Sequence, residues 1–224
     1  MITMKQGFAG AFALVLGTIS ISMVGCGNGG TTTGTGGGGG STGTHHGTGG
    51  TGGAAPAQAD TCDFYCSAIQ KHCTGVNQQF TTPAMCQAVC KTYKAGPIMD
   101  SSSNPEDDLG CRIYHSDVPA SMDPATHCFH GGPAGGAPNE CSKDFCSTFC
   151  GLAGSICTGT HQQYMTTAAC MTDCMTFPLS AGNYGTADVD KNDQFCRMYH
   201  LTAASVDPAT HCAHITKASA VCTK

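Results

Sequence analysis

The chain has 224 residues, of which 17 are cysteines and 31 are glycines, and it contains no tryptophan. Only 11% of the residues are charged, and the formal net charge is -5. This acidic balance, with lysines and arginines scattered, argues against binding to nucleic acid or to an anionic lipid surface. A cysteine content of this size points to a small scaffold held together by disulfides.

Residues 1–25 predict a signal peptide. Lys5 is the only charge ahead of an apolar run from Phe8 to Val24, and a positive start followed by an apolar stretch is typical of an export signal. A transmembrane helix is the competing interpretation because the run is nearly long enough to span a bilayer. The glycines and hydroxyl residues inside the run weaken that interpretation.

The end of the run carries a motif for lipid attachment. Met23-Val24-Gly25-Cys26 resembles the lipobox of lipoproteins cut by signal peptidase II, although Met23 departs from the usual leucine. The resemblance implies cleavage before Cys26 and a thioether from its sulfur to a diacylglyceryl group. Several acyl chains make a stable anchor, so we expect a lipid-anchored cell-envelope protein, in the outer membrane, with the bilayer as its partner through acylated Cys26. Simple secretion and a retained anchor are the alternatives.

Residues 26–60 predict a flexible tether. After Cys26 they are almost entirely Gly, Thr, Ser and Ala, which bury too little apolar surface to fold. His45 and His46 lie in this segment. A paired-histidine metal site is one interpretation of them, and two solvated linker residues is the simpler one.

The remaining sixteen cysteines form two sets of eight. The first set is Cys62, Cys66, Cys73, Cys86, Cys90, Cys111, Cys128 and Cys141; the second is Cys146, Cys150, Cys157, Cys170, Cys174, Cys196, Cys212 and Cys222. A shift of 84 residues superposes six of the eight pairs, and the last pair matches least well. The blocks 111–115 and 120–130 recur as 196–200 and 204–214. The sequence therefore predicts two tandem domains, 61–141 and 142–224.

An even cysteine count in an exported chain favours four disulfides per domain. Thiolate metal clusters are the rival interpretation, but they usually show C-x2-C pairs, and this chain has C-x3-C pairs. A four-residue step places two cysteines on one helix face. Thr82-Pro83 and Thr166-Thr167 supply the start of the second C-x3-C helix in each copy.

Two C-x3-C helices joined by a turn resemble the helical hairpins of small mitochondrial intermembrane-space chaperones, over about 30 residues per copy. An antiparallel hairpin of this kind bonds the outer and the inner cysteines of the two helices. The expected pairs are Cys62–Cys90, Cys66–Cys86, Cys146–Cys174 and Cys150–Cys170. The other four cysteines of each copy cannot be paired from the sequence.

A third helix is expected from about Asp107 to Ala120, followed by a short fourth helix. Asp123-Pro124 starts the fourth helix as N-cap and first residue, and Gly131-Gly132 ends it. The segments 95–106 and 178–190 are expected to be long polar loops. The fold class is therefore all-α, with two tandem disulfide-rich helical domains after a disordered tether.

Each copy has three histidines in matching positions: His115, His127 and His130, and His200, His211 and His214. Histidines three apart share a helix face, and a third from a neighbouring helix completes a three-nitrogen site for Zn or Cu. Tyr114 and Asp123, with Tyr199 and Asp207, are candidate partners of those imidazoles. The alternative is structural: the aspartates are helix caps and the histidines bond backbone around a disulfide.

No enzyme is expected, because the chain has no G-x-S-x-G, H-E-x-x-H or phosphate-loop motif. The repeated Cys-Arg-x-Tyr-His and His-Cys-x-His blocks, with the lipobox and tether, resemble uncharacterised Cys-rich bacterial lipoproteins of myxobacterial type; the resemblance implies an envelope location. The first hypothesis is a non-enzymatic display or interaction module for an unknown envelope or extracellular protein. The second is a Cu- or Zn-binding or electron-transfer protein with one three-histidine site per repeat.

Overall fold

The structure, a computed structural model, describes residues 58–98, 107–136 and 140–224. Within these residues the regular elements are all helical, and the backbone forms no strand beyond an isolated bridge between Lys94 and Asp108. The all-α prediction is therefore confirmed. The predicted signal peptide, Cys26, His45 and His46 lie outside the described residues.

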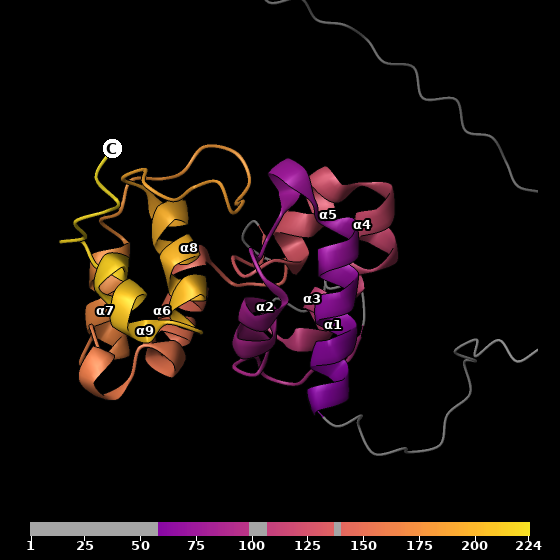
Figure 1. The fold of residues 1–224 in the computed structure, drawn as a ribbon, viewed down its shortest axis with the longest axis horizontal. Helices are drawn as coiled ribbons and strands as arrows, with labels where there is room; N and C mark the ends of the chain where they lie inside the picture. The colour runs from indigo at the N-terminus through magenta and orange to yellow at the C-terminus, as the bar shows by residue number, and fades with distance from the viewer. Residues whose placement is uncertain (1–57, 99–106, 137–139) are drawn as a thin grey trace, which may run out of the picture. The chain divides into compact units, whose positions relative to one another are not determined.

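The first copy is a group of short helices, indigo to rose in Figure 1. They are α1 Gln58–His72, α2 Pro83–Cys90, α3 Leu109–Ser116, α4 Val118–Met122 and α5 Pro124–Gly131, with a 3-10 turn η1 at Gly75–Asn77. The first of them, α1, begins three residues inside the segment predicted as tether.

The second copy repeats this order, orange to yellow in Figure 1. Its elements are α6 Phe145–Ile156, η2 Gly159–His161, α7 Thr167–Cys174, α8 Gln194–Ala204, α9 Pro208–His211 and the 3-10 helix η3 Cys212–Ile215. The pair α9 and η3 occupies the place that α5 has in the first copy, and 178–190 contains no helix or strand.

Local capping fixes where these helices begin. Thr82 accepts a hydrogen bond from the backbone N–H of Met85 at 3.2 Å, and Thr166 caps α7 in the same way. Asp123 and Asp207 cap α5 and α9 with their carboxylates. A side-chain cap contributes about 1 kcal/mol by satisfying a backbone N–H that has no partner within the helix. The predicted helix starts at Thr82, Thr166 and Asp123 are confirmed.

Four disulfides hold each copy, with the same connectivity in both. The first copy has Cys62–Cys90, Cys66–Cys86, Cys73–Cys128 and Cys111–Cys141. The second has Cys146–Cys174, Cys150–Cys170, Cys157–Cys212 and Cys196–Cys222. The structure contains the hairpin pairs expected from the C-x3-C spacing. It also joins the end of α1 to α5, and the end of α6 to η3, through the cysteines that the sequence left unpaired.

The third helix differs from its prediction in the first copy. The predicted helix 107–120 begins at Leu109 and ends at Ser116, where Asp117 leaves the helical region with φ -93° and ψ -117°. Pro119 then lies in the first turn of α4, where its missing N–H costs no helical hydrogen bond. The prediction of one continuous helix is therefore wrong for this copy.

The second copy shows why the first one breaks. Its third helix, α8, is continuous from Gln194 to Ala204. The first copy has one residue more between its third-helix histidine and the repeated block, since His115 precedes Ala120 by five positions and His200 precedes Ala204 by four. The break at Asp117 absorbs this extra residue and returns the fourth helix to the same place.

The two copies belong to one compact unit, whose described residues begin at Gln58. The Phe129 and Phe195 rings meet edge-on with centroids 6.0 Å apart. Gln79 donates a hydrogen bond to the Tyr184 carbonyl at 3.0 Å. Among the described residues, no helix is both long and apolar enough to cross a bilayer.

Candidate metal-binding clusters

Each copy brings its three predicted histidines together. In the first copy, His115 on α3 faces His127 and His130 on α5. The third-helix histidine is buried and the other two are partly exposed. In the second copy, the corresponding positions on α8, α9 and η3 form the same arrangement.

The nitrogens in each cluster lie close enough to share a metal ion. Nδ1 of His115 lies 2.9 Å from Nδ1 of His127, and the corresponding distance between His200 and His211 is also 2.9 Å. In both clusters one nitrogen from each of the three imidazoles lies within 4.8 Å of the others. Tetrahedral zinc with bonds of about 2.0–2.1 Å separates its ligand nitrogens by about 3.3 Å. Shifts on the order of 1 Å therefore convert either cluster into a three-nitrogen site.

Backbone hydrogen bonding orients one imidazole in the second copy. Nε2 of His200 lies 3.0 Å from the carbonyl oxygen of Val189. A carbonyl only accepts, so this nitrogen carries the proton and the Nδ1 lone pair points at His211. Metal-binding histidines commonly donate their second N–H to a backbone carbonyl in this way.

Burial favours the neutral form of three of the imidazoles, those of His130, His200 and His211. It lowers the pKa of His200 to about 4, because a buried imidazolium loses its hydration. Burial also lowers the pKa of His130 and of His211. A neutral imidazole is the form that binds metal ions, so the protein holds these side chains in the state that a metal site needs.

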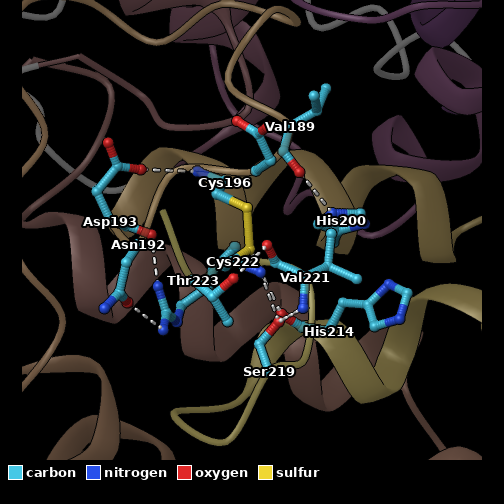
Figure 2. The surroundings of a disulfide bond; sticks show 12 residues. Val189, Asn192, Asp193, Cys196, His200, His214, Ser219, Val221, Cys222 and Thr223 are labelled. Carbon is cyan, nitrogen blue, oxygen red and sulfur yellow. Dashed lines mark hydrogen bonds between the residues drawn. A yellow bond between two sulfur atoms is a disulfide. The ribbon is translucent and has the colours of Figure 1, made fainter.

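A disulfide lies beside each cluster. Figure 2 shows His200 and His214 on the same side of the Cys196–Cys222 bond. In the first copy His115 has the same relation to Cys111 and Cys141. These sulfurs are bonded to each other, so they hold the chain near the cluster, and the nitrogens are the donors that remain.

A repeated arginine holds the chain that follows the histidine helix. The Arg112 guanidinium is fully buried and donates to the carbonyl of Gly132, while Arg197 donates to the carbonyl of Thr216 at 3.3 Å. Each guanidinium also lies 4.3 Å from an aromatic ring centre, Tyr93 in the first copy. Both arginines therefore act as structural partners of backbone carbonyls and aromatic rings.

Of the residues expected to contact the histidines, the tyrosines do so and the aspartates act as helix caps. The Tyr114 and Tyr199 rings contact the neighbouring third-helix histidine edge-on, with centroids 5.1 and 5.2 Å apart. Asp123 and Asp207 cap their helices, as the structural interpretation has it. His72 lies outside the cluster, with its Nδ1 3.1 Å from the carbonyl oxygen of Ser116.

Two neighbours of the clusters were missed from the sequence. The Val189 carbonyl is a backbone group, so no side-chain pattern marks it. Glu140 lies with Oε2 3.7 Å from Nδ1 of His130. The sequence feature that could have pointed to Glu140 is its position directly before the last cysteine of the copy.

These features define a tandem-repeat, disulfide-rich helical protein with a three-histidine cluster in each repeat. The BfoA family C-terminal domain matches the chain twice, over residues 51–144 and 137–223, and the chain therefore belongs to this family. These matches confirm the tandem repeats.

One relative is the Aurasperone B biosynthesis cluster protein A of Aspergillus niger, 35% identical over 69 residues. The match covers 31% of this chain and 22% of the relative, so the chain spans about a fifth of the relative's length. No solved structure matches. The lipoprotein type expected from the sequence stays a prediction.

Proposed function

We propose that this protein is a non-enzymatic transition-metal-binding module that holds one Zn or Cu ion in each repeat. The observation that carries the proposal is the same convergence of three imidazoles in both copies, with ligand nitrogens within 4.8 Å of one another. The surrounding disulfides and the buried arginines fix the helices that carry these histidines.

The chemistry of the donor set favours Zn or Cu. Imidazole nitrogen is a preferred donor for both metals, whereas Mg and Ca take oxygen ligands. Three protein nitrogens leave a further coordination position for water or for a ligand from solution. Such a site suits metal capture or carriage at the cell surface.

Metal titration of the purified, oxidised full chain tests this proposal. His45 and His46 are replaced by alanine and any free thiol is alkylated, so that the tether contributes no ligand. Two metal ions should bind per chain, one for each cluster, as measured by calorimetry and by elemental analysis after dialysis. Absence of binding at micromolar Zn²⁺ and Cu²⁺ would overturn the proposal.

We propose further that Cys26 anchors the chain to the cell-envelope membrane through its acyl chains, with 26–57 as the tether. The supporting observation is the Met23-Val24-Gly25-Cys26 motif after the apolar run. The compact unit would then face an envelope or extracellular partner.

The replacement Cys26→Ser tests the anchor. It should leave a precursor that is longer by the signal peptide and that takes up no labelled palmitate, because the lipid has no thiol to bond. Gel mobility and metabolic labelling measure both effects. Normal processing together with membrane retention of the variant would contradict the anchor.

A further inference from the structure

One difference between the two clusters lies at a position beside a histidine. In the first copy Glu140 precedes the last cysteine, and in the second copy Val221 does. The Oε2 atom of Glu140 lies 3.7 Å from Nδ1 of His130. The carboxylate therefore adds a negative charge beside one imidazole of the first cluster, and the isopropyl group of Val221 adds none to the second.

The backbone that directly follows Glu140 is held in place. Cys141 is bonded to Cys111 on α3, and its N–H donates to the Gly135 carbonyl at 3.0 Å. The carboxylate is thus attached to a segment that the disulfide holds against the helix carrying His115.

Gly136 allows this segment to approach the imidazole. Its φ of +83° is in the left-handed region that favours glycine. A Cβ at this position would lie 2.7 Å from Cδ2 of His130 and 3.1 Å from Cβ of Glu140. Only a residue without a side chain fits between them, so glycine at position 136 permits the close approach of Glu140 to His130.

The nitrogen that faces this carboxylate has no other hydrogen-bonding role in the described part of the chain. Nδ1 of His130 is buried there without a hydrogen-bond partner, and so is Nδ1 of His214 in the second copy. At 3.7 Å the carboxylate is too far for a hydrogen bond. A shift of about 1 Å brings the Glu140 carboxylate to the usual N–H···O distance of about 2.9 Å.

We propose that Glu140 is a positioning residue that makes the first cluster the tighter of the two metal sites. Its carboxylate accepts the Nδ1–H of His130, which leaves Nε2 as the nitrogen for the metal, fixes the ring and raises its basicity. Loss of such a carboxylate partner costs about 10–100-fold in metal affinity. This inference rests on the proposed metal-binding function.

A reciprocal exchange tests the inference in the full chain. Affinity for Zn²⁺ at the first cluster is measured in a His211→Ala background, and affinity at the second in a His127→Ala background. Glu140→Val should weaken the first site by about 10–100-fold, and Val221→Glu should tighten the second. Glu140→Gln should fall between wild type and Glu140→Val, because its amide oxygen accepts a hydrogen bond without the charge. The Tm of the metal-free protein should stay unchanged in all three variants.

The outcomes separate this inference from the function on which it rests. Equal affinities at the two sites, unchanged by Glu140→Val, would overturn the inference and leave the metal function standing. A lower Tm of metal-free Glu140→Val with unchanged affinity would assign Glu140 a structural role and also overturn it. Failure of the wild-type chain to bind any metal would remove both proposals.

Discussion

Replacing His211 by alanine should reduce the metal bound by each chain from two ions to one. His211 supplies one of only three nitrogens in its cluster, and its Nδ1 lies 2.9 Å from that of His200. Loss of an outer partner alone costs about 10–100-fold in affinity, so loss of a direct ligand should cost at least about 100-fold. Elemental analysis after dialysis gives the stoichiometry, and calorimetry gives the affinity. Adding His127→Ala should remove the second ion.

The matched control is His161→Asn. His161 lies in η2, and the first copy has Asn77 at the corresponding position. This variant removes an imidazole from the same copy without touching the cluster, so both ions should stay bound. The metal hypothesis fails if His211→Ala binds as much metal as His161→Asn. A loss of thermal stability in metal-free His211→Ala alone would instead favour the structural interpretation of the histidines.

Local rules made part of the fold predictable. The step from Cys62 to Cys66, matched by that from Cys86 to Cys90, places each pair of cysteines on one helix face. The resemblance to antiparallel C-x3-C hairpins then predicted the two bonds that the structure contains. The helix starts were also predictable from local sequence. A cap such as Thr82 bonds only to the first turn of its own helix. A cap depends on one helix, and the hairpin bonds join two helices that follow each other in the chain.

The disulfides between distant cysteines could not be predicted from the sequence. Cys73 and Cys128 are separated by 55 residues, and no periodicity links them. Only the packing of α1 against α5 brings their sulfurs together. The helix break at Asp117 is different, because its cause was visible as Pro119 and as the one-residue offset between the copies.

The sequence predicted which histidines belong to the candidate site, but it could not predict their arrangement in space. The sequence marked His115, His127 and His130 because they lie in blocks that recur in the second copy. Their convergence depends on how α3 crosses α5, which is a tertiary feature. Glu140 could not be predicted from the repeat pattern, because the second copy has a valine at the corresponding position.

Removing the Cys157–Cys212 disulfide should cost about 4 kcal/mol of unfolding free energy and should weaken the second metal site. The bond closes a loop of 55 residues, and the entropy that it removes from the unfolded chain grows with loop length. Cys212 also lies between His211 and His214, so the bond ties both ligands to the end of α6. The double variant Cys157→Ala, Cys212→Ala is measured by denaturant unfolding and by metal titration in a His127→Ala background.

The Cys150–Cys170 bond provides the comparison. It closes only 20 residues and joins α6 to α7, which carry no ligand of the cluster. Its removal should cost about 3 kcal/mol and leave the affinity of the second site within a few-fold of the unmodified value. If both double variants lose the same affinity, the disulfides act on the site only through general stability. A loss of metal affinity only when Cys157–Cys212 is removed would show that this bond positions the imidazoles. Both double variants lower the unfolding free energy, but only this one releases the chain on either side of Cys212.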